Sequence, residues 1–336
     1  MNTDKPGPLA SAPEIIGLVE EDLRLVEHEL GLETIASVET VTKIAKYLQN
    51  SGGKRLRPSL LLICARLVSD GEAVTPAAIR LAAVVELLHA ATLVHDDVID
   101  VAEIRRGRPS ANVQWGNHTC VLAGDWLYMQ AFQIALKMRD FHILDLLIGL
   151  TQLMVEGELI QLERIGKIQV SEADCMELVD RKTAGLFSVC AKLGAVIAGA
   201  EQALEEKLGE FAWNLGMAFQ LVDDMLDFSS REEILGKPVG GDLREGKITL
   251  PLVYALESAT AEETRQIETI LADRSYKRVR FEDIRTIVQR RQGIQRTLER
   301  AQQFGERAMQ IATEFVDSPY QRALVAIADL VIERDK

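Results

Sequence analysis

The chain has 336 residues, of which 47% are hydrophobic and only 5% aromatic, so a large core is possible and its apolar part is mainly Leu, Ala, Ile and Val. Mixed with Glu, Lys, Arg and Gln, this composition favours a soluble helical protein over a sheet protein. The formal net charge of −13 excludes a general nucleic-acid surface, which needs clustered Lys and Arg, so any phosphate-binding site must be local.

The first 13 residues are rich in Pro, Ala and Ser and lack the basic start and apolar run of a signal peptide. We therefore expect a disordered tail over residues 1–13, followed by one domain over residues 14–336. The most apolar stretch, Leu81–Val94, is shorter than the ~20 residues that cross a bilayer, which predicts a buried helix and no transmembrane segment. The four cysteines are scattered without CxxC spacing, which is typical of reduced thiols in a cytoplasmic protein.

Apolar residues recur at three- and four-residue spacing along the rest of the chain, which predicts helices that each bury one face. The predicted helices are, in chain order, Ile15–Leu32, Ile35–Leu48, Pro58–Val68, Pro76–Val101, Cys120–Lys137, Phe141–Ile165, Ser171–Ala198, Leu204–Phe228, Leu250–Glu257, Glu262–Ala272, Asp283–Val288, Ile294–Phe315 and Pro319–Ile332. Short breaks with Gly, Pro or Ser separate them, and neither strand alternation nor a long linker interrupts the pattern. The expected fold class is all-α.

Two of these helices end in the same acidic pattern, DDxxD. The first copy consists of Asp96, Asp97 and Asp100, and the second of Asp223, Asp224 and Asp227. Positions i and i+4 share a helix face, so the outer carboxylates of each copy repel one another. Apolar flanks direct both copies towards the interior, where unpaired charge is costly. One copy alone fits a solvated acidic surface about as well, but two copies favour a magnesium site, which implies a phosphorylated ligand.

Three breaks combine glycine with positive charge: Ser51–Pro58, Arg105–Pro109 and Gly236–Lys247. Each break taken alone is best explained as a solvated turn. The EF-hand, HExxH, P-loop, GxSxG and Rossmann patterns are all absent from the sequence. Any chemistry must therefore come from metal, basic side chains and a cavity.

In order, the motifs GGKRLRP, LLHAATLVHDDVID, RRG, KT, FQLVDDMLD and GKPVGGDLREGK resemble those of the trans-polyprenyl diphosphate synthases, in particular their long-chain, octaprenyl-like branch. The resemblance runs from about Ser51 to Leu252. It implies the type I isoprenoid synthase fold, a single-domain bundle of long helices around a central cavity. It also implies a homodimer.

The implied reaction condenses isopentenyl diphosphate with an allylic, farnesyl-like diphosphate through metal-assisted ionisation. The implied product is a long all-trans polyprenyl diphosphate of about six to ten isoprene units. The preferred primer and the lipid served downstream stay open, as does a transient membrane contact for product release.

Residue by residue, the resemblance implies two sites. Asp96 and Asp100 would bind two of three magnesium ions with Asp97 in support, and Asp223 and Asp227 would hold the third, with Asp224 behind them. The allylic diphosphate would be held by Arg105, Lys182, Thr183, Gln220, Lys237 and Lys247. Isopentenyl diphosphate would be held by Lys54, Arg57, His89 and Arg106. The residues that would act most directly on the leaving diphosphate are Asp96, Asp100, Asp223, Lys182 and Lys237.

Product length would depend on the space beyond Asp96. Ala91 and Thr92 lie about one helical turn before that aspartate, and both are small, which predicts a long product. Phe132 and Ala135 are candidate wall residues further along the path, although core packing explains them equally well. The group of Glu156, Glu158 and Gln161 fits either support for the site or a solvated helix face.

Two alternatives remain at this point. A type I terpene cyclase would share the first acidic pattern but would not need the basic residues of a second substrate site. An inactive subunit of a heteromeric synthase would keep the fold and lose ligands, whereas both acidic patterns are intact here.

Overall fold

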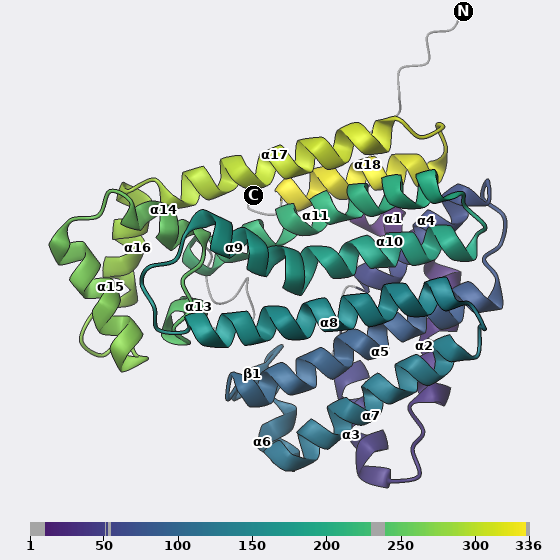
Figure 1. The fold of residues 1–336 in the computed structure, drawn as a ribbon, viewed down its shortest axis with the longest axis horizontal. Helices are drawn as coiled ribbons and strands as arrows, with labels where there is room; N and C mark the ends of the chain where they lie inside the picture. The colour runs from purple at the N-terminus through teal and green to yellow at the C-terminus, as the bar shows by residue number, and fades with distance from the viewer. Residues whose placement is uncertain (1–10, 51, 53–54, 230–238, 334–336) are drawn as a thin grey trace, which may run out of the picture.

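The computed structural model describes residues 11–50, 52, 55–229 and 239–333, and within them it is almost entirely helical (Figure 1). The helices are α1 (Ala12–Gly17), α2 (Glu20–Glu33), α3 (Glu39–Gln49), α4 (Leu56–Val68), α5 (Pro76–Ile99), α6 (Ala111–Trp115), α7 (Asn117–Leu136), α8 (Phe141–Arg164), α9 (Glu172–Val179), the π-helical turn η1 (Asp180–Ala184), α10 (Gly185–Ile197), α11 (Gln202–Ser229), α13 (Gly241–Arg244), α14 (Leu250–Leu256), α15 (Ala261–Asp273), α16 (Phe281–Arg290), α17 (Gly293–Thr313) and α18 (Pro319–Ile332). Two short strands, β1 (Ile104–Arg105) and β2 (Arg108–Pro109), pair antiparallel. The all-α fold class is confirmed.

The structure departs from the predicted elements at several places. Helix α1 begins at Ala12, so residues 12 and 13, which we expected in the tail, are helical; Pro13 is tolerated because the first turn leaves its backbone donors unpaired anyway. The predicted helix Ile15–Leu32 is divided between α1 and α2. The predicted helix Ser171–Ala198 contains the turn η1, and the hairpin of β1 and β2 was not predicted at all.

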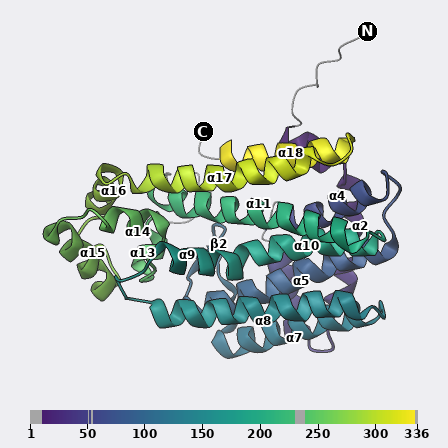
Figure 2. The ribbon, with the colours of Figure 1, turned by 45° about the horizontal axis from the view of Figure 1, so that its top comes forward.

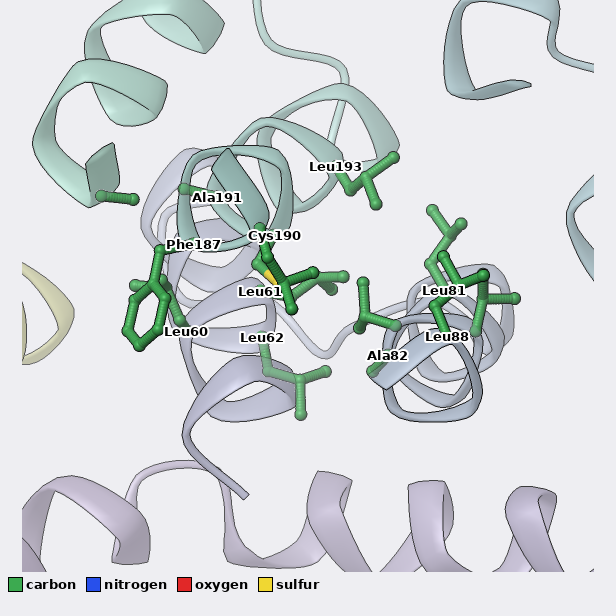
Figure 3. Close-up of a cluster of buried hydrophobic side chains, with 14 of the residues drawn as sticks. Leu60, Leu61, Leu62, Leu81, Ala82, Leu88, Phe187, Cys190, Ala191 and Leu193 are labelled. Carbon is green, nitrogen blue, oxygen red and sulfur yellow. The ribbon is translucent and has the colours of Figure 1, made fainter. Parts of the chain in front are cut away.

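The core is built around α5, which packs against α2, α4, α7 and α10. Leucine side chains of α4 and α5 meet Phe187, Cys190 and Leu193 of α10 in one buried cluster (Figure 3). At 24 residues α5 is long and apolar enough to cross a membrane, but 67% of its most apolar window is buried inside the protein. This burial is that of a core helix, as predicted for Leu81–Val94, and the bounds of α5 agree with the predicted helix Pro76–Val101 to within two residues.

The helices are stacked in layers, with α17 and α18 on one side, α10 and α11 in the middle, and α5, α7 and α8 beyond them (Figures 1 and 2). A second apolar cluster joins the C-terminal part of α11 to α14, α16 and α17. This arrangement leaves the C-terminal halves of α5 and α11, which carry the two acidic patterns, on the walls of the same cavity.

Candidate active site

Two adjoining cavities lie between the helices. The larger one has a volume of about 610 Å³ and is walled by α5, α7, α8, the α9–η1–α10 segment, α11 and residues 242–249. The smaller one has a volume of about 220 Å³ and is lined by residues 55–57, by α5 and by the β1–β2 hairpin. Arg57, His89 and Leu93 line both cavities, so these side chains form the boundary between them.

The smaller cavity is basic. It is lined by Arg55, Arg57, Arg105 and Arg106, and it contains the buried carboxylate of Glu86. Arg55 is held by Glu86 at 2.6 Å and by Glu27 at 2.5 Å. Within the part of the chain that the structure describes, the buried Nε of Arg57 has no hydrogen-bond partner. Burial lowers the pKa of this guanidinium, an effect that the charge of Glu86 partly offsets. An anion in this cavity would satisfy Arg57.

Backbone geometry places two of these arginines. Arg106 lies at the tip of the hairpin with φ of 51°, followed by Gly107 with φ of 73°, which are the left-handed angles of a tight hairpin turn. Arg55 precedes α4 with φ of 47°. Non-glycine residues adopt this conformation at a cost that is typical of functional sites. Lys54, expected beside them, lies outside the described residues.

His89 is neutral in this setting. Burial lowers its pKa well below the ordinary value, and the positive charges of Arg57 and Arg106 lower it further. A neutral imidazole can donate one hydrogen bond and accept another, so His89 can orient an anion without adding charge.

The first acidic pattern lies where α5 ends. Asp96 lines the larger cavity, and burial, together with the nearby carboxylates of Glu158 and Asp100, raises its pKa to about 6 despite the opposing charge of Lys182. Asp97 is fully buried; Arg105 donates to its Oδ1 at 2.6 Å, while Oδ2 has no hydrogen-bond partner in the described residues.

Arg105 is therefore on the side of the smaller cavity in this structure, whereas the sequence placed it with the allylic diphosphate.

Asp100 accepts a hydrogen bond from Lys247 Nζ at 3.0 Å, and Lys247 also pairs with Glu245 at 2.8 Å. Lys247 thus connects the end of α5 to the segment after α13. It also lines the larger cavity.

The second acidic pattern is oriented differently from our expectation. Asp227 is fully buried and accepts hydrogen bonds from the backbone N–H groups of Gly241 and Asp242 at 3.3 and 3.4 Å, so it organises the start of α13 instead of facing the cavity. Asp224, which we expected behind the site, lines the larger cavity and accepts from Gln220 at 2.9 Å. Burial and the charge of Asp242 raise the pKa of Asp224 well above its ordinary value.

The side chains predicted to hold the allylic diphosphate gather on the opposite wall. Lys182 Nζ donates to Glu158 at 2.5 Å and to Gln161 at 3.1 Å, and Thr183 donates to Gln220 at 2.8 Å. All five side chains line the larger cavity. Glu156 instead pairs with Arg181 at 2.6 Å outside the cavity. Lys237 lies outside the described residues.

The proposed length-determining residues separate into two groups. Thr92 lines the larger cavity, together with Tyr128 of α7. Ala91 is fully buried in the core and does not line the cavity, because it lies about 140° around the helix from Asp96 whereas Thr92 lies about 40° away. Ala135 is also buried in the core, and Phe132 packs against the same core. Ala91, Phe132 and Ala135 are therefore core positions and not cavity walls.

Two acidic residues that the sequence did not single out also line the larger cavity, Asp125 of α7 and Asp242 of α13. No spacing rule identifies either of them. Among the described residues, no three His, Cys, Asp or Glu side chains are close enough to hold a metal ion on their own. The neighbouring carboxylates of Asp96, Asp100 and Glu158, which repel one another, nevertheless fit hard divalent cations that take further oxygen ligands from a substrate. Asp97 lines the smaller cavity and not the larger one.

The fold is thus an all-helical bundle in which a basic cavity adjoins a larger one lined by carboxylates, Lys182 and Lys247. The polyprenyl synthetase family model matches residues 38–288. Octaprenyl diphosphate synthase from Haemophilus influenzae is 34% identical over 98% of this chain and 99% of the relative, and the Escherichia coli protein of the same name is 32% identical over 95% and 98%.

Among solved structures, the polyprenyl synthase of Caulobacter crescentus, crystallised with calcium and isoprenyl diphosphate, superposes with a TM-score of 0.92 at 34% identity, covering 98% of this chain and all of that one. The decaprenyl diphosphate synthase of Rhodobacter capsulatus gives 0.90 at 30% identity, with 97% and 100% coverage. The chain belongs to the polyprenyl synthetase family. It is a trans-prenyltransferase.

Proposed function

We propose that this enzyme adds isopentenyl diphosphate repeatedly to a farnesyl-like allylic diphosphate, giving a long-chain, octaprenyl-like product. The observation that carries the proposal is the pair of adjoining cavities, one basic and one lined by carboxylates, that meet at Arg57, His89 and Leu93. Two diphosphates bound on either side of this boundary would bring their hydrocarbon ends together, which condensation requires.

The larger cavity would bind the allylic substrate. Magnesium ions, proposed to be three, would be held by Asp96 and Asp100 on one side and Asp223 on the other, with Asp97 and Asp227 acting indirectly, and when bound they stabilise negative charge on the departing diphosphate. The calcium in the Caulobacter relative supports a divalent-cation site. Lys182 and Gln220 would donate hydrogen bonds to the same diphosphate, and Thr183 would do so once its hydroxyl turns from Gln220 to the ligand. Lys237 and Lys247 would be further cationic partners.

The smaller cavity would bind isopentenyl diphosphate without metal, through Lys54, Arg57, Arg106 and neutral His89. The allylic C–O bond breaks and its electron pair leaves with the diphosphate. The double bond of isopentenyl diphosphate then forms the new C–C bond with the allylic cation, and a proton is lost to the departed diphosphate. No protein nucleophile takes part in this sequence.

A long product fits the wall beyond Asp96. The nearest cavity-lining position one turn away is Thr92, a small residue, so the growing tail can pass into the apolar part of the cavity between α5, α7 and α8. We propose about six to ten isoprene units, as for the octaprenyl and decaprenyl relatives.

The outer face of α7 and α8 supports a homodimer. Exposed apolar side chains follow both helices: Leu122 (68% exposed), Met129 (63%), Ile148 (46%) and Leu159 (57%). A stripe of this kind on two adjacent helices favours burial against another copy. We further propose a cytoplasmic location, with any membrane contact limited to release of the product.

The test is product analysis with the purified chain alone, supplied with magnesium, farnesyl diphosphate and isopentenyl diphosphate. We expect all-trans polyprenyl diphosphates with a main length of about eight units. Products that stop at three or four units would contradict the long-chain assignment, and turnover that needs a second protein would indicate an inactive partner subunit instead.

A further inference from the structure

The turn η1 determines how Lys182 and Thr183 face the larger cavity. Leu178, Lys182 and Leu186 all line that cavity at intervals of four residues. Residues four apart also line this cavity in the regular α-helix α8, as Met154, Glu158 and Leu162 do, so the spacing alone does not require a wider turn. In η1, however, the N–H of Gly185 donates to the carbonyl of Asp180, five residues back, and this π-type turn sets the direction of the side chains within it.

Neighbouring helices leave just enough room for the wider turn. A Cβ atom on Gly157 of α8 would lie 2.8 Å from Cβ of Arg181, and one on Gly216 of α11 would lie 2.7 Å from Cα of Ala184. Both distances are too short for real side chains. The backbone of η1 is therefore seated between two helices at positions where only glycine fits.

Two hydrogen bonds attach η1 to α11. Trp213 Nε1 donates to Asp180 Oδ1 at 2.6 Å, and Thr183 Oγ1 donates to Gln220 at 2.8 Å. Trp213 and Gln220 are seven residues apart, so they share one face of α11. The Trp213 ring also packs edge-on against Phe304 of α17, with ring centroids 5.7 Å apart, which limits the movement of its N–H.

Asp180 and Trp213 lie behind the site, because neither lines the larger or the smaller cavity. We propose that they are positioning residues: their hydrogen bond fixes the start of η1 and thereby aims Lys182 and Thr183 at the allylic diphosphate. This inference rests on the proposed function, because it assigns the allylic substrate to the larger cavity. It concerns one substrate only, since η1 contributes no residue to the smaller cavity.

The test compares three variants with the wild type. Trp213→Phe removes the donor and keeps the ring contact with Phe304, Asp180→Ala removes the acceptor, and Asp180→Asn is the matched control because its amide oxygen still accepts from Trp213. We expect the first two to raise KM for farnesyl diphosphate by about fivefold, with KM for isopentenyl diphosphate changed less than about twofold. We expect Asp180→Asn to stay within about twofold of the wild type for both substrates.

A binding measurement provides a readout that does not depend on turnover. The dissociation constant of an allylic thiodiphosphate, whose sulfur bridge resists ionisation, is measured by calorimetry with magnesium, and we expect it to rise in parallel with KM. Unchanged binding in Trp213→Phe and Asp180→Ala, or an equal rise in both KM values, would overturn the inference. A wild type that binds the analogue but makes no condensation product would instead overturn the proposed function.

Discussion

At the scale of single residues, three carboxylates of the site pair with Lys or Arg side chains. Arg105 neutralises Asp97 at the smaller cavity, whereas Lys247 neutralises Asp100 and Lys182 neutralises Glu158 at the larger one. The pKa of Asp96 is raised to about 6 because burial and the carboxylates of Glu158 and Asp100 outweigh the charge of Lys182. On the basic side, the buried Nε of Arg57 has no hydrogen-bond partner among the described residues.

Asp96 should make the stability of the metal-free protein depend on pH. Its pKa in the folded protein, about 6, is above the ordinary value of 3.8, so the folded state takes up a proton that the unfolded state releases in this range. Its contribution to the stability of the metal-free protein should therefore increase as the pH falls through 6 towards 3.8, and should be lost as the pH rises. Magnesium affinity should instead decrease as the pH falls, because a protonated carboxyl is a poor metal ligand.

Urea unfolding of the metal-free protein, measured at pH values from about 5 to about 7, tests this prediction against Asp96→Asn. The wild type should gain stability relative to the variant as the pH falls. Parallel curves for the two proteins would show that Asp96 titrates normally.

At the scale of elements, hydrophobic periodicity predicted most helices and put both acidic patterns at helix ends. It could not predict η1, because that turn depends on glycines of α8 and α11 that are distant in sequence. Periodicity also could not predict that Asp227 accepts hydrogen bonds from the backbone of Gly241 and Asp242, because these residues belong to a later segment of the chain. The spacing of residues along one helix predicts which of them share a face. Which other segment packs against that face depends on the whole fold.

The difference between Ala91 and Thr92 leads to a prediction on product length. Thr92→Phe should shorten the main product to about three or four isoprene units, because the ring would enter the larger cavity beyond Asp96. Ala91→Phe should instead overpack the core and lower the free energy of unfolding by about 1–3 kcal/mol.

Product chains are measured by chromatography, with Thr92→Val as the control of similar volume. That control should retain the wild-type length. Wild-type length in Thr92→Phe, or shortening only in Ala91→Phe, would show that the growing chain follows another path.

At the scale of the whole molecule, α7 and α8 lie at the outer edge of the layered bundle (Figure 2). Both helices carry exposed apolar side chains. Val155, Leu159 and Leu162 of α8 line the larger cavity while being 49%, 57% and 42% exposed. The apolar face and the cavity wall are therefore continuous. A second subunit on this face would cover residues that the product tail also contacts.

The dimer prediction uses Leu122 and Met129, two exposed apolar residues one heptad apart on α7. Changing both to Glu should weaken self-association by about tenfold or more, because charges would be buried at the interface. Val316→Glu is the control, since Val316 is 85% exposed in the segment between α17 and α18. Sedimentation measurements should show a monomer only for the double variant; a dimer in both proteins would place the interface elsewhere.

The central claim is that the two cavities bind different diphosphates, and steady-state kinetics with each substrate varied in turn test it most directly. Arg106 lines only the smaller cavity and Lys182 only the larger one. Arg106→Ala should raise KM for isopentenyl diphosphate by about tenfold with little change for the allylic substrate, and Lys182→Ala should do the reverse. Equal effects of either variant on both substrates, or the opposite pairing, would contradict the assignment.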